Sequence, residues 1–152
     1  MTRTFRFAHR WELPAPADRV YAALADVEGY AAWWPQVRTV HRVDADSGHT
    51  TIRSVLPYSL DLVLRREVED PGGRLLRVAL SGDLEGWCQW TVSERGSGAS
   101  AADFAQEAVV TPALLARTAA LTGPLLRANH AWMMRSGRAG LAAYLSRPVR
   151  ED

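Results

Sequence analysis

The sequence contains no lysine, one cysteine and no long apolar run. Cys88 is the single cysteine among 152 residues, which excludes an intramolecular disulfide and suits a reducing compartment. All 18 basic residues are arginines, which we interpret as the base composition of a GC-rich bacterial genome. No apolar run approaches the roughly 20 residues needed to cross a bilayer, and the first residues lack the apolar segment of a secretory signal. We therefore expect a cytoplasmic protein with no integral membrane association.

Signatures of metal and nucleotide chemistry are missing as well. The histidines have no metal-ligand spacing with one another or with Cys88, so we expect no metal site. The sequence has no Gly-x-Ser-x-Gly elbow, no Walker loop and no Gly-x-Gly-x-x-Gly motif, so we expect no cofactor. The formal net charge is +1, which gives no reason to expect a nucleic acid or an anionic membrane as partner.

The residues that are present predict an α+β fold in a single domain. Apolar and polar residues alternate from Phe5 to Trp11, which predicts a first strand that ends before Pro14. Residues 16–34 then favour two short helices, because an apolar stripe at helical spacing is interrupted at Gly29. Six more strand patterns, separated by turn residues, follow at residues 36–43, 50–56, 60–68, 75–80, 84–92 and 100–110.

A long helix is expected at the C-terminal end of the sequence. Thr111 and Pro112 suit the N-cap and the first helical position, and the pattern stays helical as far as Leu145. Gly123-Pro124 should kink or split this helix, because proline removes a backbone hydrogen bond. The short connections between the strands favour an antiparallel meander. We therefore expect a curved antiparallel sheet of about seven strands wrapped around the long helix.

Several motifs in this order of elements are similar to one known superfamily. They are Ala15-Pro16-Ala17 with Val20-Tyr21 and Leu24, Asp26-Val27-Glu28, Trp34-Pro35-Gln36-Val37, Gly86 with Trp90-Thr91-Val92, and Gly137 with Leu141 and Tyr144-Leu145. With them the chain resembles the START-like helix-grip (SRPBCC) superfamily, in particular its polyketide cyclase/dehydrase and lipid-transport branch. The resemblance spans nearly the whole chain and implies one ligand-binding domain over residues 1–152. Members of the superfamily bind sterols, lipids, polyketides or plant hormones, and some catalyse ring closure or dehydration.

The strand predicted at residues 84–92 supplies the first candidate ligand contacts. By alternation, Gly86, Cys88 and Trp90 share its more apolar face, which should line a cavity beneath the long helix. Gly86 would make room for a ligand and Trp90 would form an aromatic wall, although simple core packing of Trp90 against the helix fits the same pattern. Trp87 lies on the opposite face, as a dimer contact or a lone exposed aromatic residue.

Further candidates are expected at the cavity mouth and on the second of the six strands. The resemblance implies that Trp33 and Trp34 lie at the mouth, one packed inward and the other partly exposed to solvent, unless both serve only the core. Tyr58, in a turn, would add a hydroxyl group to the rim. Alternation predicts that this strand has an inner face of Ile52, Ser54 and Leu56. The same alternation directs three strand arginines outward, namely Arg53, Arg65 and Arg77.

His130 is the best candidate for a catalytic residue. Helical spacing places it on the inward face of the long helix together with Leu126 and Met133, which would also line the cavity. A histidine in a cavity could polarise a carbonyl group or move a proton near neutral pH. A neutral, hydrogen-bonded core histidine fits the same pattern, so both interpretations stay open.

Three functions are compatible with these observations. The first is the binding of a hydrophobic small molecule (a lipid, a polyketide or another ring-containing compound) in a cavity on the order of 300–1,000 Å³ between the sheet and the helix. The second is a polyketide aromatase/cyclase or dehydratase that acts in the same cavity. The third is a non-enzymatic protein-interaction module, in which Trp87 and the outer arginines would matter more than the cavity. A homodimer is compatible with all three.

Overall fold

Seven strands form one antiparallel sheet in the computed structural model, which describes residues 3–53, 59–112 and 123–146. The strands are β1 (Arg3–Leu13), β2 (Val37–Arg42), β3 (Ser47–Arg53), β4 (Ser59–Asp70), β5 (Leu75–Gly82), β6 (Leu84–Glu94) and β7 (Ser100–Val110). Their order across the sheet is β1-β7-β6-β5-β4-β3-β2. Consecutive strands from β2 to β7 are therefore neighbours, and β1 pairs with β7. This arrangement confirms the predicted antiparallel sheet.

Two short helices follow β1, and one long helix ends the described part of the chain. They are α1 (Ala17–Ala25), the 3₁₀ helix η1 (Val27–Ala32) and α3 (Gly123–Leu145). Pro16 is the N-cap of α1, and Asp18 places a negative charge in its first turn. Residues 113–122 of the predicted C-terminal helix lie outside the described residues, and α3 begins at the predicted break, Gly123-Pro124. Among the described residues, no helix is both long and apolar enough to span a membrane.

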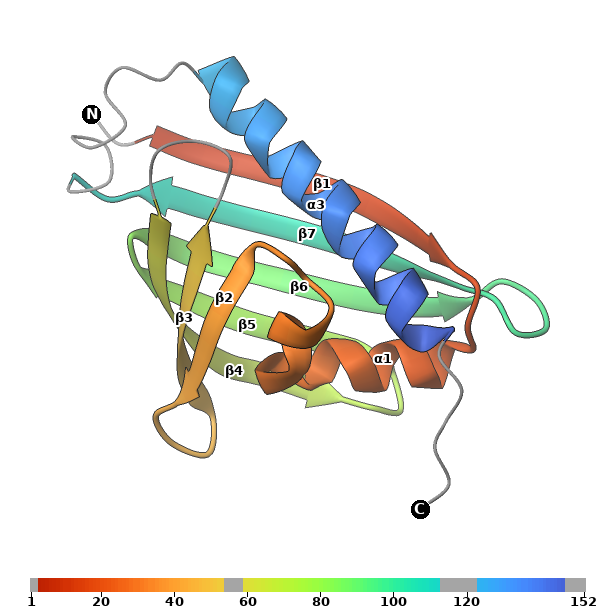
Figure 1. Cartoon of the computed structure of the whole chain (residues 1–152). Coiled ribbons are helices and arrows are strands. Elements are labelled where there is room, and N and C mark those ends of the chain that lie inside the picture. Colours follow the sequence, from red (N-terminus) through yellow and green to blue (C-terminus); the bar gives the residue numbers. More distant parts are fainter. Residues whose placement is uncertain (1–2, 54–58, 113–122, 147–152) are drawn as a thin grey trace.

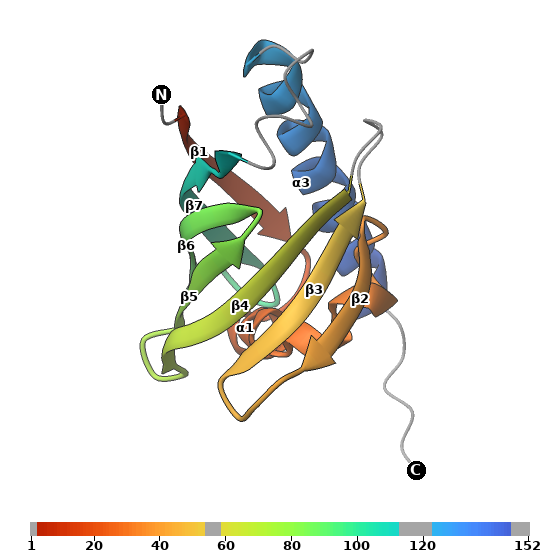
Figure 2. The ribbon, with the colours of Figure 1, turned by 90° about the vertical axis from the view of Figure 1, so that its left-hand side faces the viewer.

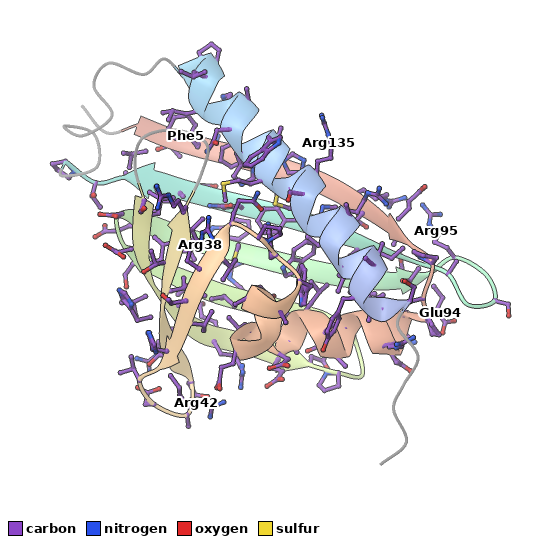
Figure 3. All side chains as sticks on the ribbon, viewed as in Figure 1. Phe5, Arg38, Arg42, Glu94, Arg95 and Arg135 are labelled. Atoms are coloured by element: carbon purple, nitrogen blue, oxygen red, sulfur yellow. The ribbon has the colours of Figure 1, made fainter. Side chains whose placement is uncertain are left out.

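The sheet curves around α3, which crosses it diagonally (Figures 1 and 2). Figure 1 shows α1 and η1 at the end of the sheet that lies near the C-terminal half of α3. In Figure 3 the labelled side chains of Arg42, Arg95 and Arg135 point away from the space between the sheet and α3. The curved sheet and the long helix together confirm the predicted helix-grip fold, and these three charges lie on its outside.

Tryptophans build the core beneath the C-terminal half of α3. The ring centroid of Trp11 on β1 lies 4.7 Å from that of Trp90 and 5.4 Å from that of Trp34. Trp33 stacks on Trp34 with a centroid distance of 5.4 Å. The indole Nε1–H of Trp34 donates a hydrogen bond to the carbonyl oxygen of Met133 at 3.0 Å. The four indoles therefore connect β1, β6 and the segment after η1 to the long helix.

Two glycines of α3 allow the helix backbone to approach these indoles directly. A Cβ atom at Gly137 would lie 2.6 Å from the ring of Trp34 and 2.9 Å from that of Trp11. A Cβ atom at Gly140 would lie 1.8 Å from the carbonyl oxygen of Trp33, closer than atoms can approach. Only glycine at these two positions is compatible with the observed packing of α3 on the tryptophan core.

The outer face of the sheet carries the strand arginines. Arg77 places its guanidinium 4.3 Å from the centroid of the Trp87 ring and forms a hydrogen bond with Gln89 Oε1 at 3.4 Å. Arg53 and Arg65 are exposed. Trp87 is therefore covered by a cation–π contact on the side of the sheet away from α3.

We expect Gly140→Ala to lower the free energy of unfolding by about 1–3 kcal/mol, because the added methyl group forces α3 away from Trp33. Alanine normally stabilises a helix relative to glycine by about 1 kcal/mol, so the sign of the effect is diagnostic. Gly72→Ala is the matched control, since a Cβ atom there would meet only Asp70 Oδ1 at 3.5 Å. Urea unfolding of both variants measures the difference. A Gly140→Ala protein as stable as the wild type would contradict the direct packing of α3 on Trp33.

Candidate ligand-binding site

A cavity of about 190 Å³ lies between the sheet and α3. Trp34 and Trp90 of the tryptophan core form part of its wall. A second hydrophobic cluster, with Phe5 and Val110 buried and Leu126 packed against them, forms another part. The cavity therefore lies where the two clusters of the core meet. Its volume is smaller than the range expected from the sequence.

The lining is almost entirely apolar. It consists of aliphatic and aromatic side chains from every strand of the sheet and from η1 and α3, including Phe5, Phe7, Val27, Val37, Ile52, Leu60, Leu62, Leu64, Leu76, Val78, Leu80, Leu84, Phe104, Ala108, Val110, Leu126, Met133 and Met134. No described residue of the lining is an aspartate, glutamate, arginine or lysine. The described lining thus carries no formally charged Asp, Glu, Arg or Lys side chain, and beside such apolar walls hydrogen bonds and charges have larger energies than in water.

Few polar groups reach this lining, and most of them are held by the protein itself. Thr50 Oγ1 donates a hydrogen bond to the carbonyl oxygen of Thr39 at 2.9 Å, and the Tyr30 hydroxyl donates one to the carbonyl oxygen of Leu24. Burial raises the pKa of the Tyr30 hydroxyl above its ordinary value and raises the pKa of the Cys88 thiol to about 12. Both groups are therefore protonated and neutral at physiological pH. Within the described residues, no three His, Cys, Asp or Glu side chains gather in a set that could hold a metal ion.

His130 lies in the wall formed by α3. Its ring stacks on Phe7 with a centroid distance of 3.7 Å, and the ring of His9 lies 5.3 Å away. Its Nε2 atom lies 3.1 Å from Gln106 Oε1. Burial, together with the nearby His9, lowers the pKa of His130 from 6.5 to about 3. The imidazole is therefore neutral near pH 7, and Nε2 donates its proton to the amide oxygen of Gln106.

Seven of the residues predicted from the sequence line the cavity together. They are Trp34, Ile52, Cys88, Trp90, Leu126, His130 and Met133. Three other predicted residues, Ser54, Leu56 and Tyr58, lie outside the described residues. The helical and strand periodicities thus bring side chains from β3, β6, α3 and the segment after η1 to one place.

Two of the predicted residues are placed differently from the expectation. Gly86 does not make room for a ligand: a Cβ atom there would lie 2.0 Å from the carbonyl oxygen of Glu107, so glycine is required by the close approach of β7. Trp33 packs in the core against Trp11 and Trp34 and is not part of the described lining. Neither indole of the Trp33-Trp34 pair is partly exposed to solvent, because the two residues are only 5% and 8% exposed.

Sequence reasoning missed most of the lining, including the aromatic residues Phe7 and Tyr30 and the amides Gln106 and Asn129. Gln106 lies on the same face of β7 as Phe104 and Ala108, and strand alternation alone would have found it. Asn129 lies four residues before Met133 on α3, so helical spacing would have found it as well. Neither side chain is titratable, so a prediction based on titratable groups does not include these two amides.

Comparison with known proteins gives a family and a fold. Residues 4–146 match the family model described as polyketide cyclase / dehydrase and lipid transport. No curated protein matches the sequence.

Among solved structures, the Zhui aromatase/cyclase from Streptomyces sp. R1128 is similar with a TM-score of 0.77 and 17% identity, over 97% of each chain. A START superfamily protein from Mycobacterium smegmatis has a TM-score of 0.71 and 13% identity, covering 92% of this chain and 96% of its own. A point mutant of norcoclaurine synthase from Thalictrum flavum has a TM-score of 0.60 and 16% identity, covering 95% of this chain and 97% of its own. At such identities these likenesses show a common fold, and they confirm the predicted START-like architecture.

The lowered pKa of His130 makes stability depend on pH in a defined window. Below pH 6.5 the unfolded chain binds a proton that the buried ring does not accept until about pH 3, so stability falls as the pH is lowered through this range. From pH 7 to pH 5 we expect the wild type to lose about 1–2 kcal/mol more than His130→Gln, which has no ring to protonate. Urea unfolding at the two pH values measures this. Equal losses in both proteins would show that His130 is protonated in the folded state at pH 5.

Proposed function

Because the chain belongs to the polyketide cyclase / dehydrase and lipid transport family, we propose that it binds a neutral, ring-containing hydrophobic molecule between the sheet and α3. The observation that carries this proposal is the cavity itself. Apolar side chains line a cavity of about 190 Å³ next to the closely packed tryptophan core. Closely packed interiors rarely leave spaces larger than a water molecule, so a cavity of this size requires an explanation.

The cavity volume limits the size of the ligand. An engineered apolar cavity of about 150 Å³ accepts a benzene molecule, so 190 Å³ suits a compact molecule of one or two rings. The aromatic side chains of Tyr30, Trp34, Trp90 and Phe104 offer faces and edges against which such rings can stack. A long acyl chain is less suitable, since it would need a longer enclosed channel.

The electrostatics of the lining favour a neutral ligand. A carboxylate or phosphate transferred from water into this lining would find no arginine or lysine among its described residues. An unpaired buried charge costs several kcal/mol, which a small ligand cannot recover from apolar contact. Neutral ring compounds avoid this cost and gain about 25 cal/mol for each Å² of apolar surface that they bury.

Catalysis of a cyclisation or dehydration is a second candidate function, favoured by the position of His130 in the cavity wall. Its imidazole is held by Gln106 at 3.1 Å and by Phe7, and could orient a bound substrate through a hydrogen bond. The lowering of its pKa to about 3 makes the ring a weak base, so a substrate would have to raise this pKa before His130 could accept a proton. The cavity would supply the folding of the substrate into a reactive conformation. For this candidate, His130→Gln should abolish turnover of a polyketide-like substrate while ligand binding is retained, and unchanged turnover would remove His130 from the mechanism.

The binding proposal predicts that filling the cavity abolishes binding without unfolding the protein. Ala108 is 2% exposed and faces the cavity from β7, so Ala108→Phe should weaken the binding of naphthalene at least tenfold. Equilibrium dialysis with naphthalene measures the affinity. Native mass spectrometry of the protein as purified, followed by extraction, identifies any small molecule that it retains.

Ala105→Phe is the matched control, because Ala105 lies on the same strand and its side chain points to the other face of the sheet. Naphthalene affinity should be unchanged in this variant, and circular dichroism should show both variants folded. Equal affinity for naphthalene in Ala108→Phe and in the wild type would place binding elsewhere and refute the proposal.

A further inference from the structure

Two polar atoms in the wall of the cavity have no hydrogen-bond partner among the described residues. They are Asn129 Oδ1 and His130 Nδ1, both buried and on consecutive residues of α3. Gln36 and Ser100 carry the other buried polar atoms in this condition, and neither residue is part of the described lining. Buried polar atoms are nearly always paired, so two atoms left unpaired by the described residues in one wall of an apolar cavity are places where a ligand could supply the partner.

Both atoms are hydrogen-bond acceptors. Asn129 Nδ2 lies 3.7 Å from Met133 Sδ, and since a thioether sulfur can only accept, the amide is oriented with its N–H toward the sulfur and its oxygen unpaired. On the neutral ring of His130, Nε2 carries the proton that faces Gln106 Oε1, which leaves Nδ1 with a lone pair. The two unpaired atoms of this wall are therefore acceptors, and each needs a donor.

The amide of Asn129 can turn toward a ligand at little cost. Among the described residues, its side-chain hydrogen bond is the weak one to the sulfur of Met133, a flexible side chain that also lines the cavity. The ring of His130, in contrast, is fixed between Phe7 and Gln106. Asn129 is thus the adaptable acceptor of the pair and His130 the rigid one.

We propose that the ligand carries a hydroxyl group that donates a hydrogen bond to Asn129 or His130, so that the site selects neutral ring alcohols or phenols over hydrocarbons and ethers. This inference rests on the proposed function, because it names the class of ligand bound in the same cavity. Asn129 acts as a specificity-determining residue: the donor satisfies an acceptor that a pure hydrocarbon leaves buried and unpaired.

Three compounds that share the naphthalene ring system distinguish hydrogen-bond donation by the ligand from hydrogen-bond acceptance and from apolar contact. Naphthalene has no polar group, 2-naphthol can donate and accept, and 2-methoxynaphthalene can only accept. By equilibrium dialysis at pH 7 we expect the wild type to bind 2-naphthol about tenfold more tightly than either of the others. Equal affinity for 2-naphthol and 2-methoxynaphthalene would overturn the proposal, because an ether oxygen cannot satisfy an acceptor.

Substitution of Asn129 tests its role directly. Asn129→Leu should remove most of the preference for 2-naphthol while naphthalene binds as well as before or better. Ala128→Leu adds the same side chain on the exposed side of the same helical turn and should change neither affinity. His130→Phe, which retains a ring to stack on Phe7, provides an independent second variant with the same expected loss of preference. If both lining variants keep the full preference for 2-naphthol, these acceptors do not select the ligand.

The failure of this inference is distinguishable from the failure of the proposed function. If naphthalene and 2-naphthol bind with equal affinity in the wild type, and Ala108→Phe abolishes both, the cavity binds ring compounds but the acceptors do not select among them. If none of the three compounds binds, the proposed function fails, and the hydroxyl preference fails with it.

Discussion

Direct contact between α3 and the tryptophans after η1 is the constraint on which the rest of the structure depends. Gly137 and Gly140 remove the side chains that would separate the helix from Trp34 and Trp33, and the hydrogen bond from Trp34 to Met133 fixes the position of the helix along its axis. Large rings therefore fill one half of the space between the sheet and the helix. In the other half the described cluster has only Phe5 and Val110 buried, and its remaining members are partly buried. The C-terminal half of α3 is thus packed directly on the tryptophans. Beneath its N-terminal half, side chains do not completely fill the space between the helix and the sheet.

Charge is distributed as this arrangement requires. Ion pairs such as Arg10–Asp103 and Arg6–Glu107 connect β1 and β7 on the solvent side of the sheet, where water screens them and each contributes little to stability. Inside, the titratable groups in the described lining are neutral at pH 7: burial favours the uncharged forms of Tyr30, Cys88 and His130. The ionisable side chains of the described lining therefore contribute no permanent charge. Within this lining, only the shape of the cavity and a few neutral polar atoms remain to distinguish one ligand from another.

The sequence allowed most of the fold to be predicted, because the signals that specify it are local. Strand alternation and turn residues predicted all seven strands, and the break at Gly123-Pro124 coincides with the start of α3. The positions of individual side chains were harder to predict. The role of Gly86 depends on how closely β7 approaches it, and the burial of Trp33 depends on Gly140, which lies more than 100 residues away in the sequence. Such contacts between distant segments decide whether a residue lines the cavity or packs the core, and no local pattern encodes them. Asn129 and Gln106 follow the helical and strand periodicities. They are neutral amides, however, and a prediction based on titratable groups does not include them.

The arrangement of the indoles has a consequence for how the protein responds to light. Trp11 lies close to Trp33, Trp34 and Trp90, and Trp33 stacks on Trp34, so excitation absorbed by one of these indoles can pass to the others through short ring-to-ring distances. Trp34 and Trp90 belong both to this group and to the wall of the cavity. A molecule that quenches either indole would therefore dim the emission of the whole cluster. Intrinsic tryptophan fluorescence would then follow the occupancy of the cavity without an attached dye, against the background emission of Trp87 and Trp132.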